Sequence, residues 1–106
     1  MSLRSFIFLL CVSLSFLPIQ ATARDIEVKY RSSLVNVDDF TDYNLKRSSF
    51  VDEILYHKAD QYLLVKLRST FYHYCGVPYL TVQNWVKSDS LGTFYQRHIK
   101  GKFECS

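Results

Sequence analysis

The residues with the most chemical potential in this sequence form one short run, Tyr72-His73-Tyr74-Cys75. A histidine between two tyrosines offers a base, two phenolic hydroxyls and two aromatic faces, which suit proton transfer or stacking on a flat ligand. The cysteine that follows is a nucleophile only as a thiolate beside a base. The run therefore has three possible roles: a catalytic centre, a stacking platform for a ligand, or a structural strand.

Motifs that would support catalysis are missing from the sequence. It has no GxSxG, HExxH, glycine-rich phosphate loop or paired-carboxylate signature. The histidines, His57, His73 and His98, are scattered, and no CxxC pair offers a zinc site. His73 is the only histidine that merits a catalytic test. We therefore predict no catalytic residue, no metal site and no cofactor.

The first 23 residues have the pattern of a secretory signal peptide. Arg4 is their only charge, an apolar run extends from Phe6 to Leu17, and Ala21-Thr22-Ala23 offers small residues for signal peptidase. The run is twelve residues long, whereas a helix needs roughly 20 to cross a membrane. We predict cleavage after Ala23 and a periplasmic or secreted protein, with no transmembrane segment in the mature chain.

Cleavage would leave two cysteines, Cys75 and Cys105, in a chain of 83 residues. An even number of cysteines in a small exported protein indicates a disulfide. A chain of this length forms one domain with a small core. Closing the loop between the two cysteines would stabilise it by about 3–4 kcal/mol in the chain-entropy model.

Three runs rich in β-branched and aromatic residues predict the central fold. They are Phe50–His57, Tyr62–Leu67 and Thr70–Cys75, and short interruptions at Lys58–Gln61 and Arg68-Ser69 separate them. Short connections join antiparallel neighbours. The pattern therefore predicts a three-stranded antiparallel meander.

The second interruption also predicts the register of the strands. If Arg68-Ser69 is a two-residue loop, Val65 lies opposite Tyr72 and Leu63 lies opposite Tyr74. Both tyrosines then share the apolar face, and we interpret them as core residues, with their hydroxyls at its rim, in preference to a ligand platform. The first turn adds Ile54 and Tyr56 to the same face. The opposite face carries Lys66, Phe71 and His73, and is expected to be wet or lightly covered.

Helices are expected after the meander. Val77-Pro78 favours a helix start, with apolar residues recurring at three- and four-residue spacing up to Val86. Ser90 is a predicted N-cap for a second helix and Gly101 its stop. Asp25–Tyr30 alternates as a strand does, whereas Arg31–Ser49 is polar and irregular. The predicted fold class is α+β: a three-stranded antiparallel meander, then two short helices packed on one face, with an extra N-terminal strand.

Positive charge is concentrated in the second half of the mature chain. Residues 58–106 have seven basic and three acidic side chains, whereas residues 24–57 have five and seven. Arg97, Lys100 and Lys102 could together bind an anionic partner. Cationic residues at a helix C-terminus also oppose the helix dipole without any ligand, so ordinary surface charge is the competing interpretation.

The order and spacing of short motifs resemble the KTSC domain, a small family also found at the C-terminus of some lysyl-tRNA synthetases. The resemblance covers roughly residues 46–104, and we predict a leader at 1–23, an extension at 24–45 and a KTSC-like domain at 46–106. Leu55 departs from the family, where a small residue is usual. The motifs are Ser48-Ser49, Ile54-Leu55-Tyr56, Tyr72-His73-Tyr74, Val77-Pro78, Ser90-Leu91-Gly92, Phe94, Ile99-Lys100 and Phe103.

The resemblance implies no established activity, and RNA binding has been suggested for the family from the synthetase context. Export argues against nucleic acid as a partner of this chain. We predict a non-catalytic binding module for an unknown protein or an anionic ligand. The alternatives are a small hydrolase, and an inhibitor or capping protein that would display a contiguous exposed apolar patch. The predicted binding residues are Tyr72, His73, Tyr74, Arg97, Lys100 and Lys102.

Overall fold

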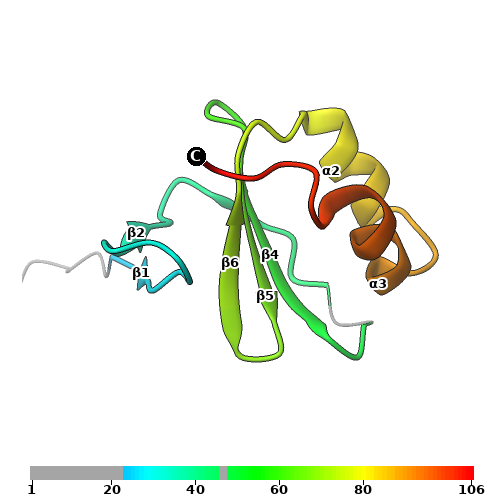
Figure 1. Cartoon of the computed structure of the whole chain (residues 1–106), viewed down its shortest axis with the longest axis horizontal. Coiled ribbons are helices and arrows are strands. Elements are labelled where there is room, and N and C mark those ends of the chain that lie inside the picture. The colour runs from blue at the N-terminus through cyan, green and yellow to red at the C-terminus, as the bar shows by residue number, and fades with distance from the viewer. Residues whose placement is uncertain (1–22, 46–47) are drawn as a thin grey trace, which may run out of the picture.

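A four-stranded antiparallel sheet forms the centre of the computed structural model, which describes residues 23–45 and 48–106 (Figure 1). The predicted leader therefore lies almost wholly outside the described residues. The sheet order is β3-β4-β5-β6, and β1 and β2 form a separate two-stranded sheet. In the described part of the chain, no helix is long and apolar enough to span a membrane. The strands are β1 (Asp25–Ile26), β2 (Val35–Asn36), β3 (Thr41–Asp42), β4 (Val51–His57), β5 (Tyr62–Leu67) and β6 (Thr70–Tyr74).

The predicted register of the meander is confirmed. Val65 pairs with Tyr72 and Leu63 with Tyr74, and the two-residue loop brings Leu67 opposite Thr70. The first turn behaves as predicted too, with His57 paired to Tyr62. Because paired residues share a face of the sheet, the apolar side chains of all three strands gather on one side.

Helices cover this apolar face (Figure 1). They are α2 (Tyr79–Val86), α3 (Leu91–Phe94) and a π-helical turn, η3 (Tyr95–Ile99). Ser90 caps α3 as predicted, accepting a hydrogen bond from the Thr93 amide at 3.1 Å, and Gly101 follows the last turn with φ at 75°. The main core contains Ile54, Tyr56, Leu63, Val65, Tyr74, Val82, Trp85, Leu91, Tyr95 and Ile99, among others.

The opposite face of the sheet is a second core, which corrects the expectation of a wet or lightly covered surface. Leu55, Leu64 and Phe71 are buried there beneath the N-terminal extension, residues 24–45. The extension contributes four buried aliphatic side chains, Ile26, Val28, Val35 and Val37. Alternation along each strand brings apolar residues to both faces of this sheet, so both faces need a cover.

The first strand of the extension is shorter than predicted, and the segment after it contains more strands than predicted. Only Asp25–Ile26 forms strand β1, although the predicted alternation persists, with Ile26 and Val28 buried and their neighbours exposed. The segment expected to be irregular contains β2 and β3. These strands have two residues each, too short for a periodic signal in sequence.

Arg24 fastens the start of the extension to the sheet. Its guanidinium donates two hydrogen bonds to the Glu53 carboxylate, at 2.8 and 3.1 Å. Its backbone N–H donates to Oδ1 of Asp38 at 3.0 Å. The hydrogen bonds from Arg24 hold the pKa of Glu53 below its ordinary value, against the opposing effect of burial.

Candidate functional site

Strand β6 lies at the edge of the four-stranded sheet, and segments from both ends of the chain lie along it. On one side, the Lys29 amide donates to the Phe71 carbonyl at 2.9 Å. On the other, the Cys75 amide donates to the Phe103 carbonyl at 2.8 Å. The residues of β6 between these two contacts are therefore flanked by the N-terminal extension and the C-terminal tail, residues 100–106.

A hollow of about 420 Å³ lies between the two flanking segments. We call it the β6-edge hollow. It brings three predicted residues of β6, Tyr72, His73 and Tyr74, together with the predicted Lys100 of the tail. Its full lining is Tyr30, Tyr72, His73, Tyr74, Tyr95, Lys100, Gly101, Glu104, Cys105 and Ser106.

Tyr74 forms the base of the hollow and belongs to the main core. Its side chain is 7% exposed, and its hydroxyl shares a hydrogen bond with the Tyr95 hydroxyl at 2.5 Å. Burial, followed by this hydrogen bond, raises the pKa of Tyr74 far above its ordinary value. Tyr72 is half-buried against the same core. Tyr74 is therefore a core residue with a neutral phenol, as interpreted from the sequence, but its hydroxyl is buried against Tyr95 and does not lie at the rim of the core.

Tyr30 stands at the rim of the hollow and was not among the predicted site residues. Its φ is 67°, in the left-handed region, where a non-glycine residue costs about 1–2 kcal/mol. A turn closed by the Arg31 amide and the Val28 carbonyl, at 3.2 Å, sets this conformation. The side chain is 84% exposed. The strained backbone therefore holds an aromatic ring in solvent, and nothing in the composition of the segment signals this.

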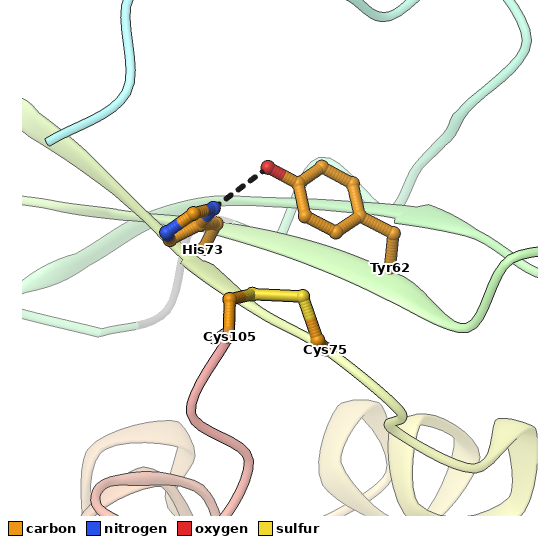
Figure 2. Close-up of a disulfide and its surroundings, with 4 residues drawn as sticks. All are labelled: Tyr62, His73, Cys75 and Cys105. Atoms are coloured by element: carbon orange, nitrogen blue, oxygen red, sulfur yellow. Dashed lines mark hydrogen bonds between the residues drawn. A yellow bond between two sulfur atoms is a disulfide. The ribbon is translucent and has the colours of Figure 1, made fainter. Parts of the chain in front are cut away.

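The His73 imidazole is engaged within the protein. Its Nδ1 forms a 2.9 Å hydrogen bond with the Tyr62 hydroxyl (Figure 2). Burial lowers the pKa of His73, as does the positive charge of Arg31, while Glu104 acts in the opposite direction. The ring is therefore neutral near neutral pH and held in place by Tyr62, which argues for a structural side chain and not a free base.

The predicted disulfide is present in the structure between Cys75 and Cys105 (Figure 2). Their Cα atoms are 4.9 Å apart. The bond joins the residue after β6 to the C-terminal tail, next to the contact between Cys75 and Phe103. It therefore closes one end of the β6-edge hollow, and Cys105 is part of its wall.

The other predicted cations and histidines lie elsewhere. Arg97 and Lys102 are exposed but do not line the hollow, so only Lys100 of the basic group contributes to it. His98 packs on the Phe94 ring, with centroids 4.6 Å apart. Within residues 23–45 and 48–106, no group of three or more potential ligands could hold a metal ion.

His57 belongs to a second hollow, of about 450 Å³, whose lining includes Cys75. Its Nδ1 lies 3.2 Å from Oδ2 of Asp60. The geometry is not that of a directed hydrogen bond, which leaves this buried nitrogen without a hydrogen-bond partner. Phe40 packs on the same ring, with centroids 5.2 Å apart.

Comparison with known proteins identifies a family and a similar solved structure. The family model of the KTSC domain matches residues 47–103. Among solved structures, this chain is similar to a KTSC domain protein from Yersinia pestis, with 32% identity and a TM-score of 0.58 over 63% of this chain and 94% of that one. No curated protein matches. The range of the family model excludes Tyr30, Glu104 and Cys105, so part of the hollow lies outside it.

Proposed function

This chain belongs to the KTSC domain family, and on that premise we propose that it is an exported, non-catalytic binding module that holds its ligand in the β6-edge hollow. One observation carries the proposal. Tyr30 from the extension, Tyr72 and His73 from β6, and Lys100 from the tail converge on a single hollow. Such convergence of aromatic and polar side chains on one concavity is typical of ligand sites.

The groups in the hollow are suited to contact rather than to reaction. Cys105 is consumed in the disulfide, and the imidazole of His73 is bound to Tyr62. Tyr74 and Tyr95 share their hydroxyl hydrogen bond. The exposed side chains able to meet a ligand are those of Tyr30, Lys100, Glu104 and Ser106. Together they offer stacking, hydrogen bonding and charge, and among the described residues that line the hollow no nucleophile is hydrogen-bonded to a base.

The surroundings of Arg24 support export with cleavage after Ala23. Cleavage there would convert the Arg24 backbone nitrogen into an α-ammonium group. That nitrogen already lies 3.0 Å from a carboxylate oxygen of Asp38, so the new charge would gain an ion pair. The disulfide also suits an oxidising compartment.

Processing gives the first test. We expect N-terminal sequencing of the protein recovered from the periplasm or the culture medium to begin at Arg24, because Ala21 and Ala23 suit signal peptidase. Recovery of intact Met1, or retention in the membrane fraction, would contradict the export half of the proposal.

Variants at the rim of the hollow give the second test. The exported protein is purified natively from its own host, and the molecules that co-purify with it are measured by mass spectrometry. In a Tyr30→Ala, Lys100→Ala double variant we expect the recovered ligand to fall about tenfold, because the exposed ring and the ammonium are removed while the core is kept.

Lys87→Ala is the matched control for the second test, since Lys87 is an exposed cation outside the hollow. It should retain the ligand at the parental level. The same recovery from all three proteins, or no bound molecule in the parent, would reject the hollow as the binding site.

The alternatives rest on weaker observations. A capping protein would need a contiguous apolar patch. In the described part of the chain, two large exposed apolar side chains lie in the extension, Tyr30 and Leu34, and two on α2, Tyr79 and Leu80. The extension and α2 lie on opposite sides of the sheet (Figure 1). A hydrolase would have to use the pair of His57 and Asp60. The hydroxyl group in the described lining of their hollow belongs to Tyr62, and it is already hydrogen-bonded to His73 and so not free to act as a nucleophile.

A further inference from the structure

Strand β6 also has backbone groups on its outer edge that could bind a ligand. Outward-facing backbone groups recur at every second residue of an edge strand. The Phe71 carbonyl faces outward, since it accepts from Lys29, and the Cys75 amide faces outward, since it donates toward Phe103. His73, midway between them, must therefore direct its N–H and C=O to the same edge.

The hairpin geometry leads independently to the same result. A two-residue loop makes Leu67 and Thr70 a hydrogen-bonded pair. Hydrogen-bonded and non-hydrogen-bonded pairs alternate along an antiparallel hairpin. Counted from Leu67 and Thr70, the pair of Leu64 and His73 is therefore non-hydrogen-bonded. The backbone of His73 thus makes no bond to β5, and no backbone hydrogen bond within the described residues reaches it from outside the sheet.

The free backbone groups face the hollow between two stretches that are already covered. From Phe71 to Cys75 the edge spans about 13 Å, at roughly 3.3 Å per residue. Three to four residues of an extended chain fit that length. An unpaired strand edge is a template for another strand, and peptide-binding domains use it by adding the peptide to the sheet.

We propose that the β6-edge hollow binds a short extended peptide segment of another protein, one residue of which exchanges two backbone hydrogen bonds with His73. The inference rests on the proposed binding function and names its ligand class. Side chains of the peptide on either side of that residue contact the Tyr30 ring and the Lys100 ammonium. Lys100 and Glu104 give the hollow charges of both signs, which suits a peptide better than a polyanion.

Hydrogen exchange of the free, exported protein provides the first part of the experiment. The His73 amide should exchange rapidly, because it has no acceptor, whereas the Cys75 amide should be protected by Phe103. Strong protection of His73 in the free protein would mean that the edge is already closed, and would overturn the proposal.

A peptide probe completes the experiment. Tetrapeptides selected for binding to the exported protein from a displayed random library are resynthesised, each with a single N-methyl group at one position in turn. N-methylation removes one backbone donor and leaves every side chain in place. We expect affinity to fall about tenfold or more at the residue in register with His73, and less than about threefold at its neighbours, because only alternate residues of an added strand bond to the edge. Binding should also protect the His73 amide.

Two results would overturn the peptide assignment: selection that yields no binder above the Tyr30→Ala, Lys100→Ala variant, or an N-methyl scan without dependence on position. If either occurs while the native ligand still depends on Tyr30 and Lys100, the binding function stands and the peptide class is wrong. If the native ligand does not depend on them either, both proposals fail.

Discussion

Replacement of Tyr74 by alanine is expected to destabilise the protein by about 3–5 kcal/mol, the range for removal of a large buried aromatic side chain. Tyr74 is 7% exposed and pairs with Leu63 across the sheet. Its ring meets Tyr95 edge-on, with centroids 6.1 Å apart, so it links the sheet to the helical layer. Since a small domain is stable by only about 5–15 kcal/mol in total, much of the population should unfold. Urea denaturation followed by Trp85 fluorescence measures the change.

Two further variants show whether the loss comes from burial. Tyr74→Phe keeps the ring and removes the hydrogen bond to Tyr95, and should cost about 1 kcal/mol. Tyr30→Ala removes an equal ring that is exposed, and should change the stability by less than about 0.5 kcal/mol. If Tyr74→Ala were no more harmful than Tyr30→Ala, Tyr74 would be a surface platform and the core assignment would be wrong.

The three-stranded meander and the starts of the helices could be predicted from sequence because local chemistry specifies them, whereas the fourth strand of the sheet, β3, could not. A two-residue loop at Arg68-Ser69 leaves one register for its strands, and Ser90 can satisfy the free amides at the start of α3. Gly92 shows where local rules end. A Cβ at this position would lie 2.6 Å from the Phe50 ring, a restriction that comes from tertiary packing alone.

The second core and the hollow could not be predicted, because both depend on contacts between distant segments. Arg24 of the extension and Glu53 of β4 are hydrogen-bonded although they lie 29 residues apart in the sequence. It forms only a single bridge with β6, between Val28 and Phe71. A contact at one residue leaves no periodic hydrophobic pattern in the sequence that could predict it. The predicted residues of the hollow came instead from β6 and the tail, where periodicity and charge are visible in the sequence.

The extension also changes how this chain relates to its family. The KTSC model begins at residue 47, whereas the rim of the hollow includes Tyr30 and one face of the sheet is covered by Ile26 and Val28. The family domain supplies the strand edge, and the extension decides how much of it stays open. Ligand specificity at the hollow is therefore expected to be a property of this chain and not of the family as a whole.

Loss of the disulfide is expected to cost about 3–4 kcal/mol in a Cys75→Ser, Cys105→Ser double variant. The bond links residues 30 positions apart, and in the chain-entropy model a closed loop of this size restricts the unfolded chain by that amount. Both cysteines are half-buried, so serine fits without a large packing penalty. Urea denaturation of the variant and of the oxidised parent measures the difference.

The same variant shows whether the disulfide only restricts the unfolded chain or also holds the C-terminal tail against the hollow in the folded protein. If the disulfide acts on the unfolded chain alone, the folded variant should keep the backbone hydrogen bond from position 75 to Phe103, and that amide should stay protected. If the bond also holds the tail in place, the amide at position 75 should lose protection and peptide affinity should fall, because the edge beside His73 would open to water. A stability loss below about 1 kcal/mol would contradict the first expectation. In the described part of the chain, the one backbone hydrogen bond between the tail and the end of the sheet goes to the amide of Cys75, the residue after β6. We therefore expect the second behaviour, in which the disulfide sets the length of the free edge.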